Sequence, residues 1–147
     1  LMIAGWACAT ISEFTDILSG NQYYPCAGPC TEMCLLEASA QSITDTASGR
    51  EILSGVASAK GVVTDKTTGM EARMMGEVAR ATAGVEISEV NVILDKLVAL
   101  YEKNYASAPA GKTFQECYDV KTVTPTDEYM QVYDGARKKL EELGLVF

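Results

Sequence analysis

Histidine is absent from the 147-residue sequence, and this absence excludes more functions than any other feature of the composition. Without an imidazole, the chain alone cannot build a Ser-His or Cys-His nucleophile pair or a histidine-ligated metal site. A general base active near neutral pH would have to be a carboxylate with a perturbed pKa, or a group from outside the chain. Candidate chemistry therefore rests on carboxylate, amide, phenol and thiol side chains.

Positive charge and long apolar runs are also scarce. Twelve basic residues stand against 20 acidic ones, giving a net charge of −8. This charge repels phosphate backbones and anionic membrane surfaces, so we expect no nucleic-acid partner and no membrane partner. No apolar run reaches the roughly 20 residues that cross a bilayer. An odd number of cysteines, five, favours free thiols and a cytoplasmic location.

The chain is long enough for one domain with a core, because 48% of its residues are hydrophobic. It begins at Leu1, within an apolar pattern, with no initiator methionine and no capping residue before it. We therefore expect the chain to be a fragment, or the later part of a longer protein.

Apolar spacing predicts two helices in the first half of the chain. The first should end at Ser19-Gly20. Its expected core-facing residues are Ile3, Ala7, Ile11, Phe14 and Leu18. The second should run from about Thr31 to Ala47 and close at Gly49, with many small residues that allow close packing on a sheet. Residues 50–65 are expected to be irregular, with at most short strand or helix turns.

Three more helices are predicted in the second half. Thr68 and Glu71 have capping-box spacing, and Ser88 is expected to cap the next helix. The last helix should start with Thr124 as its cap and Pro125 in its first position, and should end at Gly144. The expected buried stripes are Met74, Met75 and Val78; Val90, Leu94, Leu97, Tyr101 and Tyr105; and Tyr129, Tyr133, Ala136, Leu140 and Leu143. By pattern alone, this is an all-α domain.

The stretch from Gly20 to Cys34 concentrates polar and unusual residues between two predicted helices. If residues 21–24 are extended, Gln22 and Tyr24 share one face, and their neighbours share the other. An amide and a phenol would then converge on one spot. In barrels, site residues commonly lie at the C-terminal ends of the strands, so a short polar strand that stops at a proline is a candidate place for them. Gln22 and Tyr24 are therefore the candidate site residues, although packing alone is an equal possibility on this pattern.

Three cysteines in this stretch are spaced four apart: Cys26, Cys30 and Cys34. They could bind a metal or cluster only if another cysteine or a carboxylate joined them. Small buried side chains at a tight turn are the favoured interpretation. Glu32 and Glu37 could form a catalytic pair, but a place in the first turn of a helix, at its positive end, is favoured.

Three strings in the sequence are long and unusual: residues 21–30 (NQYYPCAGPC), residues 113–118 (TFQECY), and the ending from Thr122 to Phe147. Through them, the whole chain resembles the C-terminal portion of the monomethylamine methyltransferases of methanogenic archaea. The resemblance implies an α/β fold, in a segment that is itself mostly helical. Residues 1–66 would be the last part of a (β/α)8 TIM barrel, including the strand with Gln22 and Tyr24. Residues 67–147 would be a C-terminal helical extension packed on the barrel.

The resemblance also implies an activity in methanogenesis. The family transfers the methyl group of monomethylamine to the cobalt of a separate corrinoid protein, and a pyrrolysine outside this segment binds the amine. Gln22 and Tyr24 match the family's glutamine and tyrosine that orient the amine, so they are the expected catalytic and substrate-binding residues. We expect no cofactor or metal on this segment, since the partner carries the corrinoid (cobalamin). We also expect a homo-oligomer, and no activity from the segment alone.

Two functions of other classes remain open on the residues alone. In a helical assembly or binding module, the apolar stripes would serve subunit contacts. In a cysteine-ligated metal protein, the cysteines would be ligands.

Overall fold

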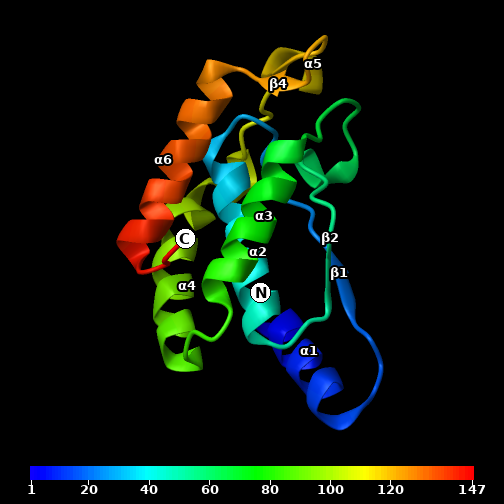
Figure 1. Cartoon of the computed structure of the whole chain (residues 1–147), viewed down its shortest axis with the longest axis vertical. Helices are drawn as coiled ribbons and strands as arrows, with labels where there is room; N and C mark the ends of the chain where they lie inside the picture. Colours follow the sequence, from blue (N-terminus) through cyan, green and yellow to red (C-terminus); the bar gives the residue numbers. More distant parts are fainter.

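The computed structural model describes all 147 residues, and helices dominate it, as predicted (Figure 1). The helices are α1 (Met2–Phe14), α2 (Glu32–Ala47), α3 (Gly69–Thr82), α4 (Ile87–Tyr101), the single turn α5 (Phe114–Cys117) and α6 (Asp127–Leu143). The strands are β1 (Gly20–Gln22), β2 (Ile52–Ser54), β3 (Tyr118–Asp119) and β4 (Thr124–Pro125). Two 3₁₀ turns complete the chain, η1 (Ala59–Gly61) and η2 (Glu102–Ser107).

Strands β1 and β2 are parallel, and α2 connects them. Gly20 pairs with Ile52, and Gln22 with Ser54. Parallel neighbours need a crossover, which is usually a helix, so β1-α2-β2 is a βαβ unit of the kind from which α/β proteins are built. The all-α interpretation of the apolar pattern was wrong, because strands of three residues are too short to show a period. Residues 50–65 are irregular apart from β2 and η1, in agreement with the expectation of at most short strand or helix turns.

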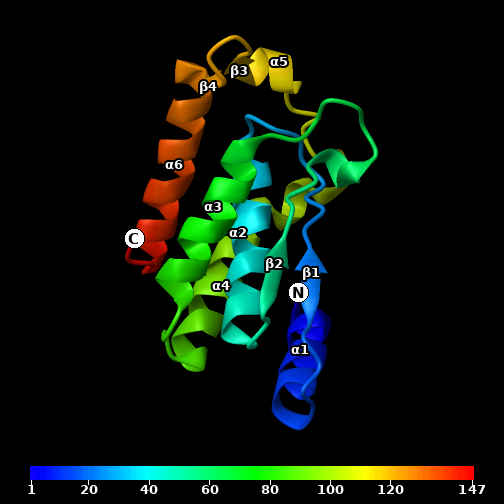
Figure 2. The same cartoon turned by 45° about the vertical axis from the view of Figure 1, so that its right-hand side comes forward.

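Helix α2 is the centre of the structure. Twelve of its 16 residues are buried. In Figure 2, β1 and β2 lie on one side of α2 and the helices α3, α4 and α6 lie on the other. The small side chains of α2 allow this close approach on several sides. Its first turn is capped by Thr31, whose Oγ1 accepts a hydrogen bond from the Cys34 amide at 3.3 Å. Because β1 lies against this helix, α2 fixes the position of the candidate site.

The predicted capping box at the start of α3 is confirmed, and it extends into the core. The Glu71 carboxylate accepts hydrogen bonds from the amide and hydroxyl of Thr68. Its other oxygen accepts one from the Tyr129 hydroxyl of α6 at 2.7 Å. The Glu71 side chain is fully buried, and burial raises its pKa. Hydrogen bonds on both oxygens make a buried carboxyl tolerable at this position.

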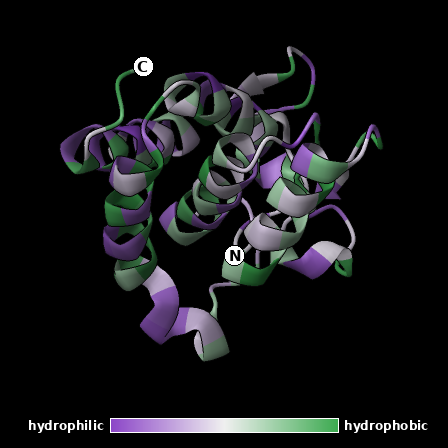
Figure 3. Cartoon of the chain, turned by 90° about the horizontal axis from the view of Figure 1, so that it is seen from below, coloured by the Kyte–Doolittle hydropathy of each residue, from purple (hydrophilic) through white to green (hydrophobic).

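Helix α1 differs from the prediction. It ends at Phe14 rather than at Ser19-Gly20. Ile3, Phe14 and Leu18 are exposed, by 82%, 73% and 72% respectively, and Ala7 is exposed as well. The buried residues of α1 are Gly5 and Cys8, which face α2. Only small residues fit there, because a Cβ on Gly5 would lie 3.1 Å from the side chains of Thr44 and Ser48. In Figure 3, the start of the chain, marked N, has the green colour of hydrophobic residues. No helix is long and apolar enough to span a bilayer.

The other helix boundaries are mostly as predicted, with two shifts. Helix α4 starts at Ile87, so Ser88 lies inside its first turn instead of capping it. The cap of α6 is Thr126, whose side chain accepts from the Tyr129 amide, because Thr124 and Pro125 pair with β3 instead. Gly144 ends α6 with a φ of +117°, as expected. The predicted stripes are otherwise buried or half-buried, except Tyr105, which lies beyond α4 and is exposed.

Candidate functional site

Strand β1 ends at Gln22, so Tyr24 lies just beyond the strand that was expected to carry it, but the side chains of residues 21–24 still alternate between two environments. Asn21 points toward α2, where its Nδ2 donates to Asp45 Oδ2 at 2.7 Å. Tyr23 also points inward: it is fully buried and packs with Ala38 of α2. Gln22 and Tyr24 are exposed, and Tyr24 retains 53% of its surface. This alternation agrees with the predicted pairing of Gln22 with Tyr24, and the two lie along the same cavity.

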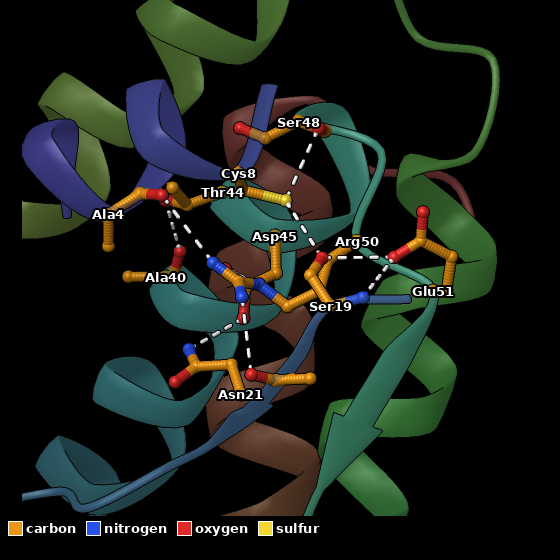
Figure 4. A network of polar contacts seen from close by, with 11 residues as sticks. Ala4, Cys8, Ser19, Asn21, Ala40, Thr44, Asp45, Ser48, Arg50 and Glu51 are labelled. Carbon is orange, nitrogen blue, oxygen red and sulfur yellow. Dashed lines mark hydrogen bonds and ion pairs between the residues drawn. The ribbon is translucent and has the colours of Figure 1, made fainter. Parts of the chain in front are cut away.

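A network of polar contacts holds β1 against α2 and α1 (Figure 4). At its centre, Arg50 Nε lies 3.0 Å from Asp45 Oδ1 in a buried ion pair. The same guanidinium donates to the carbonyl oxygens of Gly20 in β1 at 3.2 Å and of Ala4 in α1 at 3.4 Å. Asp45 accepts from Asn21 with its second oxygen. One pair of charged side chains thus joins three elements, and its Asp45 also borders the candidate site.

The residues that flank this ion pair add further bonds between β1 and the start of β2. Ser19 donates from its amide and its hydroxyl to Glu51 Oε2, at 2.8 and 2.9 Å. These two bonds lower the pKa of the Glu51 carboxyl. Cys8 of α1 lies 3.7 Å from the Ser19 hydroxyl and donates to the Ser48 carbonyl at 3.4 Å. Together these contacts fix the backbone before Gln22.

Glu37 fixes the backbone after Tyr24. Its carboxylate accepts from the amides of Cys26 and Ala27, at 2.9 and 3.0 Å. The expectation for Glu37 was wrong, since it lies beyond the first turn of α2 and its side chain is buried. Burial raises its pKa, while the two backbone hydrogen bonds oppose that rise. Glu32 does lie in the first turn, and it pairs with Lys139 of α6 at 2.6 Å.

Glu37 gives the fold a pH dependence of defined sign. The folded pKa lies above the ordinary value of 4.5, so the folded chain holds this proton more tightly than the unfolded chain. The stability that Glu37 contributes is therefore greatest below pH 4.5 and falls as the pH rises through the raised pKa. We expect the free energy of unfolding of wild type minus that of Glu37→Gln to decrease from about pH 4 to about pH 7. Denaturant titrations across this range measure the difference, and a difference that increases with pH would contradict the assignment.

A cavity of about 310 Å³ lies beside the end of β1, and Asn21 and Asp45 line it as well as the exposed side chains. Its lining includes Gln22, Tyr24, Glu37, Tyr101 and Tyr105. A larger apolar hollow of about 610 Å³ lies between α1 and α4, with Trp6 and Leu94 in its wall. Neither Gln22 nor Tyr24 lines that hollow. The smaller cavity, with its amide, phenol and carboxyl groups, is therefore the candidate site for a small polar ligand.

The cysteines of the same stretch are free thiols: Cys26 is half-buried, while Cys30 and Cys34 are buried in the same core as Cys117. Only Cys34 lies on α2, where its thiol is buried 3.3 Å from the Ser58 hydroxyl. Burial raises the pKa of Cys34 well above its ordinary value, and it raises the pKa of Cys117 to about 12. Thiols with such pKa values stay protonated and are poor ligands and nucleophiles. The structure contains no group of three histidine, cysteine or acidic side chains placed to hold a metal ion.

Comparison with known proteins identifies the family. The family described as monomethylamine methyltransferase MtmB matches residues 1–145. The chain is 99% identical over its whole length to monomethylamine methyltransferase MtmB2 of Methanosarcina barkeri, and 92% identical to MtmB of Methanosarcina mazei. It spans about a third, 32%, of the length of these relatives.

Solved structures give the same result. The crystal structure of the Methanosarcina barkeri monomethylamine methyltransferase is 98% identical and has a TM-score of 0.98. That match covers 99% of this chain and 32% of the solved chain. A second structure, described as the hydroxylamine MtmB complex, matches with the same identity, coverage and TM-score. The chain therefore belongs to the monomethylamine methyltransferase family.

Proposed function

We propose that this chain is part of an enzyme that transfers the methyl group of monomethylamine to the cobalt of a corrinoid protein, and that Gln22 and Tyr24 orient the amine. Membership of the family supports the reaction. One observation supports the roles of the two residues: they are exposed at the end of β1, while Tyr23 between them is fully buried. Exposed polar side chains on an anchored strand suit binding better than packing.

The two side chains offer complementary groups to an amine. The Gln22 amide oxygen accepts a hydrogen bond from N–H, and the Tyr24 hydroxyl both accepts and donates. Displacement at a methyl carbon requires the attacking atom, the carbon and the nitrogen to lie nearly in line, so fixed placement contributes more than proton transfer. In this reaction the partner's corrinoid supplies the cobalt that accepts the methyl group, and a pyrrolysine outside this chain supplies an electrophile for the amine.

The surroundings of the pair fit an orienting role. The network of Asp45 and Arg50 holds the backbone before Gln22, and Glu37 holds the backbone after Tyr24. A binding group placed on such a rigid element keeps its geometry without the cost of ordering a loop. The relative described as a hydroxylamine complex binds a small nitrogen compound. The cavity of about 310 Å³ beside Gln22 and Tyr24 has room for a ligand of that class.

The full-length enzyme tests the reaction itself. Here the full-length enzyme is a Methanosarcina barkeri relative in which the sequence of this chain replaces the matching third. With reduced corrinoid protein and monomethylamine, we expect the cobalt to become methylated, which the visible absorption of the corrinoid reports. Dimethylamine at the same concentration serves as the control and should react more slowly. If the full-length enzyme and a competent corrinoid protein produced no methylated cobalt from monomethylamine, the proposed reaction would be wrong.

A further inference from the structure

The segment that follows β2 lies directly against both candidate side chains. We call residues 55–61 the glycine loop, since it begins at Gly55 and ends at Gly61. A Cβ on Gly55 would lie 2.8 Å from Gln22 Nε2. A Cβ on Gly61 would lie 2.8 Å from Cε1 and 2.9 Å from Cδ1 of the Tyr24 ring. Real Cβ atoms do not approach other heavy atoms this closely, so each side chain occupies space that any residue larger than glycine would fill.

Backbone hydrogen bonds hold the glycine loop to the chain on either side of Tyr24. The amide of Ala57 donates to the Tyr23 carbonyl at 2.8 Å. The amides of Ala59 and Lys60 donate to the carbonyls of Ala27 and Pro25, at 2.9 and 2.8 Å. The loop and the segment that carries Tyr24 therefore keep a fixed spacing, and the loop contacts the Tyr24 ring.

The glycine loop also has an unusual backbone. Three consecutive residues have positive φ: Ala59 at +52°, Lys60 at +62° and Gly61 at +68°. Residues other than glycine are disfavoured in this region, and successive ones are held there only by the surrounding structure. Such conformations cluster at functional sites, where they determine the position of neighbouring groups.

We propose that the glycine loop positions Gln22 and Tyr24 for the amine, with Gly55 setting the place of the amide and Gly61 the place of the phenol ring. This inference rests on the proposed function of the two side chains. Gly55 and Gly61 are positioning residues in this proposal, since they act through Gln22 and Tyr24 and have no side chain to offer a ligand.

The matched control is a glycine that has a similar positive φ but no atoms near the position of an added Cβ. Gly84 has a φ of +83°, close to the +68° of Gly61, and an added Cβ there would meet nothing within 4 Å. Gly84→Ala thus carries the backbone cost of an alanine at positive φ without a collision. Any effect of Gly61→Ala beyond that of Gly84→Ala comes from contacts of the added Cβ, which are with the Tyr24 ring and, at 3.2 Å, with Ala57 Cβ. The Tyr24→Ala background separates these two contacts.

The experiment measures kcat and KM for monomethylamine in the full-length enzyme carrying Gly61→Ala, Gly55→Ala or Gly84→Ala. We expect Gly61→Ala and Gly55→Ala to lower kcat/KM about 10- to 100-fold, as a misplacement of about 1 Å does, and Gly84→Ala to leave it unchanged. In a Tyr24→Ala background, where the ring is absent, Gly61→Ala should have almost no further effect. A crystal structure of Gly61→Ala should show the Tyr24 ring displaced while the loop backbone stays in place.

Two kinetic results would overturn the positioning role: equal kcat/KM for Gly61→Ala and Gly84→Ala, or a loss of kcat/KM from Gly61→Ala that is as large in the Tyr24→Ala background as in wild type. Either can occur while Tyr24→Ala itself lowers kcat/KM, in which case the proposed function stands and only the role of the glycine loop is wrong. If Tyr24→Ala had no effect, the role of Tyr24 would be wrong, and an undisplaced ring in the Gly61→Ala crystal structure would separately refute the positioning role.

Discussion

Tyr24→Phe in the full-length enzyme is expected to lower kcat/KM for monomethylamine about tenfold or more, with no change in the unfolding midpoint. The hydroxyl makes no hydrogen bond within the chain, and the side chain is 53% exposed, so its removal costs the fold little. A hydrogen bond to a charged group contributes about 1.5–3 kcal/mol, and 1.4 kcal/mol corresponds to a factor of about ten. Steady-state methylation of the corrinoid cobalt measures this loss.

Tyr133→Phe is the control for removal of a phenol hydroxyl. The Tyr133 hydroxyl donates to Glu77 at 2.8 Å, far along the chain from β1, on α6. We expect this variant to lose a little stability and to keep its kcat/KM. Equal kcat/KM for Tyr24→Phe and wild type would contradict a role of the Tyr24 hydroxyl in holding the amine.

Arg50→Met is expected to destabilise the fold by about 3 kcal/mol or more. The side chains of Asp45 and Arg50 are only 2% and 11% exposed, so the variant leaves the Asp45 carboxylate buried, with the hydrogen bond from Asn21 but no positive charge beside it. Removal of one member of a buried ion pair costs about 3–5 kcal/mol, because the other charge stays unpaired. The guanidinium's bonds to Gly20 and Ala4 are lost as well. Denaturant unfolding measures the difference.

The double variant Asp45→Asn, Arg50→Met separates the charge effect from lost packing. Asparagine keeps an acceptor for Asn21 and carries no charge, so the double variant should recover at least about 1 kcal/mol relative to Arg50→Met. A double variant that is less stable than Arg50→Met would show that the unpaired charge is not the cause. Because this network fixes β1, we also expect Arg50→Met to lower kcat/KM at temperatures where it remains folded.

Sequence patterns correctly predicted the features that depend on neighbouring residues, such as helix caps and helix ends. The capping box of Thr68 and Glu71, the helix end at Gly144 and the span of α2 each follow from neighbouring residues, and all three are present. The alternation that separates Gln22 from Tyr23 follows from the period of two in an extended chain. These features are satisfied by bonds within a few residues, so the chain does not need its tertiary contacts to specify them.

The remaining features depend on which elements meet. The apolar stripe of α1 predicted burial of Ile3 and Phe14, but the neighbour of α1 in this chain is α2, and it accepts only the small face with Gly5 and Cys8. Glu37 was expected to stabilise the end of a helix, yet it binds a loop that only the tertiary fold brings to it. The single clue to the Asp45 and Arg50 pair was their position on either side of Gly49, which spacing alone does not distinguish from a surface turn.

The rate of cobalt methylation by the full-length enzyme carrying both Gln22→Ala and Tyr24→Phe tests the central claim most directly. Both side chains are exposed, so the double variant should fold with the stability of wild type. Loss of two orienting contacts predicts a fall in kcat/KM of about 100-fold or more, at about 1.4 kcal/mol for each factor of ten. Turnover equal to that of wild type in a correctly folded double variant would contradict the claim that these two residues orient the amine.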